Sequence, residues 1–245
     1  QLSQLEFHLE WKFQELEDGQ GQRKDFIDGI CMLYSGGNLS QVIDFRSAHE
    51  DRQVHDGRKT EETASLCRSI QRAVQHSGDI MSDVGGEHRV ALDLDALPPS
   101  VTDLFFVLAA FDCNDLSLFK DTAVEIHDVV LGRQLTSYRL DSQVNSQAVV
   151  MCSFTKDPDH GKWVVHGLGY PSEGNAKDYE PIKTTIASRC QADYSRWERR
   201  KHLVKLRVLH KCKRLTASSS NDCAIFMWRV LDLPVNTFQL VVLWL

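Results

Sequence analysis

Hydrophobic and polar residues alternate near the start of the chain with a period of two. Leu5, Phe7, Leu9, Trp11 and Phe13 are apolar, and the residues between them are polar or charged. Successive side chains of a β-strand point to opposite faces of a sheet. The pattern therefore predicts a strand with one buried face and one solvated face.

Most of the following sequence consists of short apolar runs separated by turn residues. Residues 26–34 and 41–45 flank Ser35-Gly-Gly-Asn38, which predicts a hairpin. Further strands are predicted at 89–94, 102–111, 123–127, 137–140, 148–154 and 163–168. Because no helical pattern separates these strands, we expect a mainly β fold, an antiparallel β-sandwich, rather than a parallel α/β sheet.

Three other segments of the chain are expected to be helical. Thr60–Gln75 carries Leu66, Ile70 and Val74 four residues apart, which predicts a helical insertion at about 60–75. Residues 186–208 interleave apolar and basic residues, and 222–231 follow a cluster of helix-capping residues. We therefore expect a β-sandwich domain at 1–182 and a basic α-helical C-terminal extension at 183–245.

The charge distribution supports the same division. The 245-residue chain has a formal net charge of −6, but residues 1–188 carry −13, residues 189–214 carry +8 and residues 215–245 carry −1. The change of sign indicates a boundary near 181–188. The sequence thus joins an acidic body to a basic tail.

Cysteine spacing and missing motifs narrow the class of protein. The seven cysteines are scattered, with no C-x-x-C pair for zinc and no disulfide framework. Cys31 and Cys152 lie in apolar runs, where we expect buried free thiols, so a reducing, cytoplasmic location fits best. No apolar run approaches the ~20 residues of a membrane helix. Nucleophile elbows, phosphate loops and zinc-protease motifs are missing, so we expect no enzymatic activity.

A series of segments resembles a known family when taken in order. The segments are residues 26–34, 76–79, 89–98, 104–112, 146–152 and 161–169. Among them, His76-Ser-Gly-Asp79 precedes an acidic loop, and Arg89–Pro98 reads R-V-A-L-D-L-D-A-L-P. Together they resemble the tellurium-resistance TerD family over about residues 3–170.

The resemblance implies a β-sandwich that binds calcium through acidic loops, with a role in metal or stress response such as tellurite resistance. The positions that match its acidic motifs make Asp28, Asp79, Asp83 and Glu87 the expected ligands, with Asp112 a weaker candidate. Calcium takes 6–8 oxygen ligands, so clustered carboxylates suit it. Two glycines, residues 85 and 86, would let the loop fold tightly around an ion.

The chain departs from the family pattern at this site. Phe26 stands where the family has an Asp, Ile80 stands where it has an Asn, and the acidic run is reduced to Asp83 and Glu87. At least three oxygen donors are lost in this way. The expectation is therefore one weak calcium site, or none.

Each candidate ligand also has a simpler explanation. Asp79 can cap a turn, Asp83 and Glu87 can belong to a solvated loop, and Asp112 can end a strand in a turn. Asp28 differs because it lies inside an apolar strand, where an unpaired buried carboxylate is costly. This position favours a role in binding metal.

The basic tail suggests partners of its own. We favour intramolecular docking of residues 189–214 on the acidic body, with an anionic membrane surface or a calmodulin-like protein as alternatives. Nucleic acid is disfavoured because aromatic residues are too sparse for stacking on bases. Two functions are therefore weighed. One is a calcium-binding module in intracellular stress-response or signalling complexes. The other is a metal-free scaffold for protein or membrane contacts through the basic helix.

Overall fold

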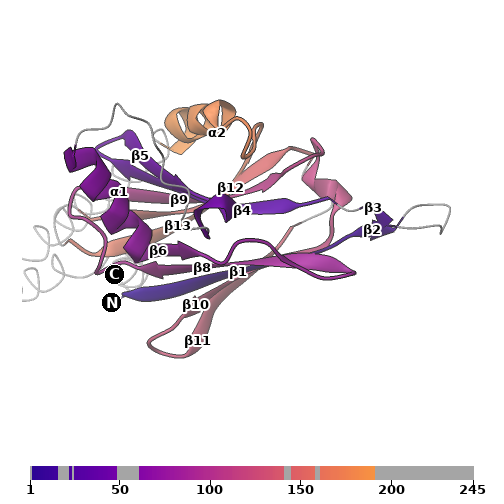
Figure 1. Ribbon diagram of the computed structural model, residues 1–245, viewed down its shortest axis with the longest axis horizontal. Helices are drawn as coiled ribbons and strands as arrows, with labels where there is room; N and C mark the ends of the chain where they lie inside the picture. Colours follow the sequence, from indigo (N-terminus) through magenta and orange to yellow (C-terminus); the bar gives the residue numbers. More distant parts are fainter. Residues whose placement is uncertain are drawn as a thin grey trace, which may run out of the picture. The chain divides into compact units, whose positions relative to one another are not determined.

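The chain is described here from a computed structural model, in which the described residues are 2–15, 22–23, 25–48, 61–140, 145–157 and 161–190. Its first compact unit spans Gln1–Ile186 (Figure 1). Of the second unit, Ala187–Leu245, only residues 187–190 are described. Most of the predicted basic helical extension at 183–245 therefore lies outside the described residues, and so does the predicted helix at 222–231.

Two antiparallel sheets form the first unit, which confirms the expected mainly β class. The first sheet has the order β11 (Arg133–Arg139), β10 (Lys120–Asp128), β1 (Gln4–Lys12), β8 (Gly85–Asp93) and β6 (Val74–His76), and β7 (Ile80–Met81) also pairs with β8. The second has the order β13 (Trp163–Ser172), β12 (Ala148–Lys156), β9 (Asp103–Ala110), β4 (Ile27–Ser35) and β5 (Asn38–Ile43). A small hairpin joins β2 (Gln14–Glu15) to β3 (Gln22–Arg23).

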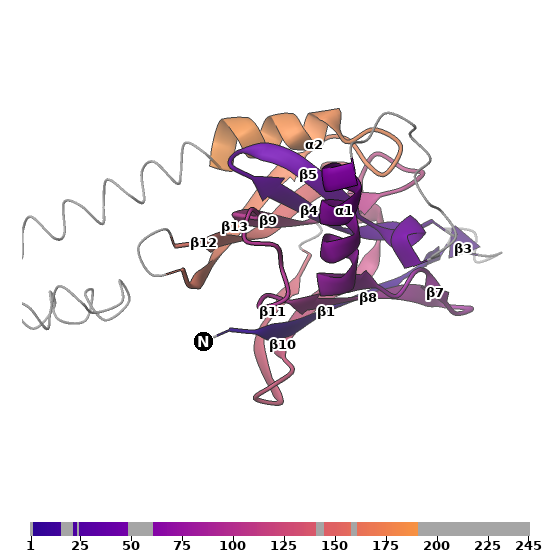
Figure 2. The ribbon, with the colours of Figure 1, turned by 60° about the vertical axis from the view of Figure 1, so that its left-hand side comes forward.

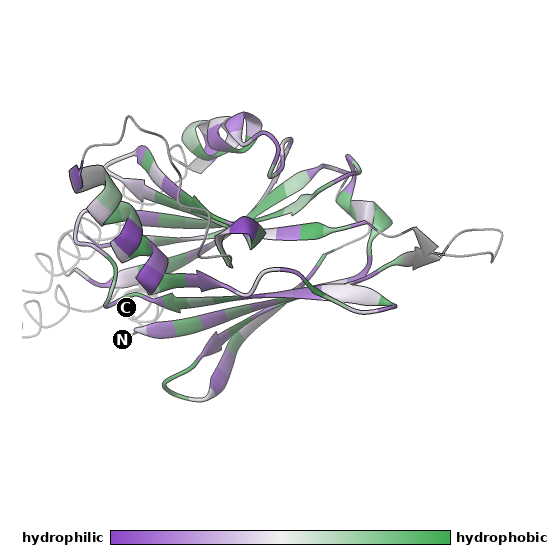
Figure 3. Cartoon of the chain, viewed as in Figure 1, coloured by the Kyte–Doolittle hydropathy of each residue, from purple (hydrophilic) through white to green (hydrophobic). Residues whose placement is uncertain are grey.

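Alternation along β1 produces the core between the sheets. Leu5, Phe7, Leu9 and Trp11 are each at most 2% exposed, whereas the residues between them reach the surface. Hydrophobic and hydrophilic residues also alternate along β10 and along much of β8 in this sheet (Figure 3). The ring of Phe7 stacks on Phe106 of β9, with centroids 3.7 Å apart, and so joins the two sheets.

Strand β4 is buried on both faces, unlike β1. One face contributes Ile27, Cys31 and Leu33 to the core between the sheets. Its other face carries Asp28 as well as apolar residues, and helix α2 (Glu180–Thr185) lies over that side of the second sheet (Figure 2). A π-helical turn, Ile186–Cys190, follows α2. The helical segment thus begins at Glu180, earlier than the predicted start at residue 186.

Helix α1 (Glu61–Ala73) confirms the predicted insertion and closes one side of the sandwich. It packs against β5 of the second sheet and against β6 and β8 of the first. Ile70 and Ala73 are buried there. The helix ends before the predicted Val74, because that residue begins β6 and pairs with Leu92 of β8. Residues 49–60, which precede α1 in the sequence, lie outside the described part.

The segment before β8 differs from the prediction. Residues 81–89 were expected to form an acidic loop, but β8 already begins at Gly85, and β7 pairs with it through Ile80–Glu87 and Met81–Gly86. The expectation that the two glycines fold the loop around an ion is wrong. A Cβ atom at Gly85 would lie 2.0 Å from the Trp11 carbonyl oxygen, and one at Gly86 would lie 2.4 Å from the Trp11 ring. Glycine is required there because β1 passes so close.

Two short 3₁₀ helices complete the described structure. They are η1 (Phe45–Ala48), directly after β5, and η2 (Leu116–Leu118), between β9 and β10. The predicted buried thiols of Cys31 and Cys152 are confirmed. Among the described residues, none of the helices has the length and apolar character needed to cross a membrane.

Candidate functional site

Asp28 is the most unusual charged residue of the described structure. It lies on β4 and is only 2% exposed, and its Oδ2 atom is buried without a hydrogen-bond partner in the described residues. Burial, together with the nearby Asp79 and Asp44, raises the pKa of this carboxyl to about 8. Without a cation, Asp28 is therefore largely protonated at neutral pH. Two positive side chains, Arg46 and Lys177, partly oppose this effect.

Two buried histidines, His76 and His88, bond to Gly29, the residue that follows Asp28 on β4, and His88 also bonds to Asp79. Strand β5 pairs with β4 only from Cys31 onward, so Gly29 has no strand partner on that edge. His88 Nδ1 accepts a hydrogen bond from the Gly29 amide at 3.1 Å, and His76 Nε2 lies 3.0 Å from the Gly29 carbonyl oxygen. The histidines take the place of the missing strand and satisfy backbone groups that would otherwise be unpaired.

These bonds fix the protonation of both rings. The Gly78 amide donates to His76 Nδ1 at 2.9 Å, so the Nε2 proton is the one that reaches Gly29. His88 likewise has Nε2 available to donate to Asp79 Oδ1, 2.8 Å away. Burial and the neighbouring His88 lower the pKa of His76 to about 4, so this ring is neutral at pH 7. Asp79 is thus held beside β4 by a neutral donor rather than by an opposite charge.

The carboxylate of a second acidic residue, Asp44, already has hydrogen-bond partners within the protein. It follows β5 and is 4% exposed, and both of its oxygens accept hydrogen bonds from the Arg46 guanidinium. Tyr179, just before α2, donates its hydroxyl to Asp44 Oδ2. Burial would raise the pKa of Asp44, but the hydrogen bonds from Arg46 and Tyr179 hold it below its usual value. Asp44 is therefore a charged residue that is paired with the guanidinium of Arg46.

The structure brings together only part of the predicted ligand set. Asp79 is close enough to raise the pKa of Asp28. Asp112 lies near the same end but forms an ion pair with Lys177, whose Nζ is 2.9 Å from Asp112 Oδ1 and lies over the Phe111 ring. Within the described residues, no set of three metal-ligating side chains close enough to share an ion includes Asp28 or Asp79.

The other two predicted ligands lie elsewhere. Asp83 is exposed in the turn between β7 and β8. Glu87 lies within β8, and its side chain meets His8 of β1 and Arg89. Because residues alternate along a strand, Glu87 and the inward-facing His88 project from opposite faces of the first sheet. Because β8 begins at Gly85 rather than at the predicted residue 89, Glu87 belongs to the strand and lies on its outer face.

Sequence reasoning missed several residues of this region. Asp44 is the clearest, since an Asp directly after the buried Ile43 that ends β5, followed by an Arg two residues later, was an available signal. The inward position of His88 was also readable, because it shares the face of Val90 and Leu92. Asp25, whose Oδ1 accepts bonds from the Phe26 and Asp112 amides and whose Oδ2 is buried without a partner, gave no comparable signal.

Comparison with known proteins finds one matching domain model and solved structures of similar fold. Residues 65–177 match the model of the TerD domain. A solved homologue of the telluride resistance protein TerD, SCO6318 from Streptomyces coelicolor A3(2), is similar with a TM-score of 0.52 and 14% identity, covering 74% of this chain and 96% of that chain.

A second solved structure, the protein of unknown function SAV2460, is similar with a TM-score of 0.54 and 10% identity, over 74% of this chain and 96% of that chain. A search of curated proteins finds no significant match. At such low identities the two structures show a shared fold alone. The TerD domain matched at residues 65–177, together with the shared fold, supports assignment of this chain to the TerD family.

Proposed function

We propose that this TerD domain is a non-enzymatic module that binds one calcium ion, weakly, at Asp28 and Asp79. The observation that carries the proposal is the buried Oδ2 atom of Asp28, which has no hydrogen-bond partner in the described residues. A carboxylate in such a place is costly unless a cation or a donor meets it. Calcium, which prefers oxygen ligands, would supply the missing partner.

The donor set supports a weak site rather than a strong one. Asp28 and Asp79 can offer carboxylate oxygens, whereas Asp44 is held by Arg46 and Asp112 by Lys177. An ion at this position would need water and backbone carbonyl oxygens to complete 6–8 ligands. Two carboxylates also provide little charge, and low ligand charge goes with low calcium affinity.

The placement of the two residues suggests what the ion would do. Asp28 belongs to β4 of the second sheet, and Asp79 lies between β6 and β7 of the first. A shared ion would tie the two sheets together and stabilise the segment 77–79. We propose that this ordering controls a protein-binding surface in stress-response or signalling complexes, as in tellurite or metal resistance.

Calorimetric titration of the full chain with calcium tests the proposal. We expect measurable heat, and a melting temperature that is higher in calcium than in chelator. A ligand at a hundredfold excess over its Kd stabilises by about 2.7 kcal/mol. Asp28→Asn and Asp79→Asn should each abolish both signals.

Two of the originally expected ligands provide matched controls. Asp83→Asn and Glu87→Gln remove one carboxylate charge each, outside the Asp28 region, and should leave calcium binding unchanged. Retained binding in Asp28→Asn would refute the proposed site. If the parent protein itself gave no heat and no shift, the calcium function would be lost, and the metal-free scaffold acting through the basic tail would become the function to pursue.

A further inference from the structure

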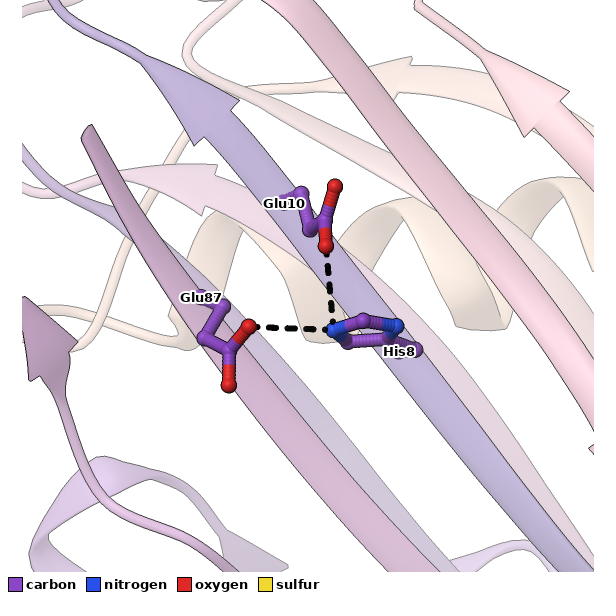
Figure 4. Close-up of side chains that lie close together, drawn as sticks. All are labelled: His8, Glu10 and Glu87. Carbon is purple, nitrogen blue, oxygen red and sulfur yellow. Dashed lines mark hydrogen bonds and ion pairs between the residues drawn. The ribbon is translucent and has the colours of Figure 1, made fainter. Parts of the chain in front are cut away.

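The outer face of the first sheet carries a second group of potential metal ligands, His8, Glu10 and Glu87 (Figure 4). His8 and Glu10 are two residues apart on β1 and therefore share a face. Glu87 lies directly opposite Glu10 on the neighbouring strand β8. His8 Nε2 is 3.3 Å from Glu10 Oε1 and 3.3 Å from Glu87 Oε2. All three ligand atoms lie within 4.8 Å of one another.

The charges of this group favour a cation. Like charges directly opposite each other on paired strands destabilise a sheet, and Glu10 and Glu87 are such a pair. Arg89 balances part of this charge, because its Nη2 lies 3.0 Å from Glu87 Oε1. That contact also orients the carboxylate, since it occupies Oε1 and leaves Oε2 directed at His8 (Figure 4).

The distances fit shared coordination better than strong hydrogen bonding. Charge-assisted hydrogen bonds between nitrogen and a carboxylate are typically about 2.7–2.9 Å long. Two ligands that each lie about 2.0–2.1 Å from a tetrahedral zinc ion are separated by roughly 3.3 Å. Both nitrogen–oxygen separations here, 3.3 Å, have that length. The three ligands also come from two paired strands, which hold them in place without a loop.

We infer that His8, Glu10 and Glu87 bind a first-row divalent metal ion of the zinc class. One imidazole with two carboxylates suits such an ion, whereas calcium favours oxygen ligands alone. The Glu10 side chain is 59% exposed, so the fourth position of a tetrahedral ion is open to water or to a ligand from another molecule. The ion would also neutralise the Glu10–Glu87 repulsion and fasten β1 to β8.

This site is separate from the proposed calcium site. Glu87 projects outward from β8, while the next residue, His88, faces inward and bonds to Gly29 and Asp79. The two sites use different ligands and different metals. Either can therefore fail in an experiment without affecting the other.

The same face contains a natural control. Glu125 and His127 of β10 repeat the two-residue spacing of Glu10 and His8, and His127 Nε2 lies 2.9 Å from Glu125 Oε2. The side chains of Glu125 and His127 are also partly exposed, at 40% and 36%. Among the described residues this pair has no third ligand close enough to share an ion. It therefore reports what an ordinary surface His–Glu pair contributes to metal binding.

Zinc titration of the full chain against a chromophoric competitor tests the inference. We expect one site that His8→Gln and Glu87→Gln each weaken more than tenfold. Losing a ligand should cost more than losing a residue that orients a ligand, which typically costs ~10–100-fold in metal affinity. His127→Gln should leave the affinity within about twofold. Cobalt substitution should give visible d–d bands without a thiolate charge-transfer band, which excludes the cysteines as ligands.

The zinc site and the proposed calcium site predict different results for the same variants. Asp28→Asn should retain zinc binding, while Glu87→Gln should lose zinc and retain calcium. Undiminished zinc affinity in His8→Gln would overturn the inference, and so would a parent protein that binds no zinc or a cobalt spectrum dominated by thiolate bands. An equal loss in His127→Gln and His8→Gln would also overturn it, since it would reduce the site to general surface attraction.

Discussion

The inner acidic site and the outer cluster place the same kind of group in opposite surroundings. Asp28 is 2% exposed and its Oδ2 atom has no partner in the described residues. Glu10 and Glu87, whose side chains are 59% and 24% exposed, share His8 on the surface of the first sheet. Strand β8 borders both regions, because Glu87 belongs to the outer cluster and His88 faces the inner acidic site.

The comparison shows that burial, rather than the number of carboxylates, decides how strongly a site needs a cation. At the inner site, low dielectric surroundings raise the pKa of Asp28 to about 8, so its charged form requires compensation. At the outer cluster water screens the charges, and repulsion is mild. Removing the carboxylate charge without metal should therefore change stability greatly inside and little outside.

The largest expected effect follows from the pKa of Asp28. In the folded protein the carboxyl keeps its proton up to about pH 8, while in the unfolded chain it loses it near 3.8. Between these values only the folded state holds the proton, so stability falls as pH rises, by about 1.4 kcal/mol per pH unit. In chelator, Asp28→Asn should therefore be more stable than the parent by on the order of 4 kcal/mol at pH 7.

Thermal or urea unfolding across pH measures this difference. The two proteins should converge near pH 4, where Asp28 is protonated in both states. His76, whose lowered pKa affects stability at acid pH, is common to both and cancels. Calcium at neutral pH should narrow the gap by stabilising only the parent. A pH-independent difference between the two proteins would show that Asp28 is not the buried acid described here.

A smaller effect is expected when Arg46, the cation paired with Asp44, is replaced. Arg46→Met keeps much of the side-chain volume but leaves Asp44, which is 4% exposed, with Tyr179 as its remaining side-chain donor. Because the Arg46 side chain is itself 41% exposed, we expect a loss of about 1–3 kcal/mol rather than the full cost of breaking a buried pair.

The same variant should respond more to calcium. Once the guanidinium is gone, Asp44 can act as a third carboxylate near Asp28 and Asp79, so the calcium-induced rise in melting temperature should exceed that of the parent. Arg89→Met on the outer face is the matched control, with a change within about 0.5 kcal/mol. Equal losses in the two variants would contradict the contrast between the buried and exposed pairs.

The fold was largely readable from the sequence because its signal is local. The period of two in β1 and the Ser35–Asn38 turn each depend on neighbouring residues only, and both are present as predicted. β6 and β7 were missed because strands of three and two residues show no measurable period. Their pairing with β8 is a tertiary effect, and it converted the expected acidic loop into a hairpin.

The candidate site was less predictable because its partners are distant in the sequence. Tyr179 meets Asp44 across 135 positions, and Lys177 meets Asp112 across 65. Acidic residues alone suggested calcium ligands, but their occupancy by Arg46 and Lys177 depends on how β5, η1 and α2 come together. Asp28 was the exception, since a carboxylate within an apolar strand indicates a buried charge whatever its neighbours.

The smallest expected effect belongs to the outer cluster. In chelator, His8→Gln and Glu10→Gln should each change the free energy of unfolding by less than about 1 kcal/mol at pH 7, because partly exposed ion pairs contribute little. Raised salt should reduce even this difference. With zinc present, only the parent should gain stability, by the binding term alone. A loss above about 2 kcal/mol without metal would mean that His8 is a structural residue of the sheet. A small loss without zinc and a clear one with it would show that strand register alone positions a metal site where the fold does not depend on it.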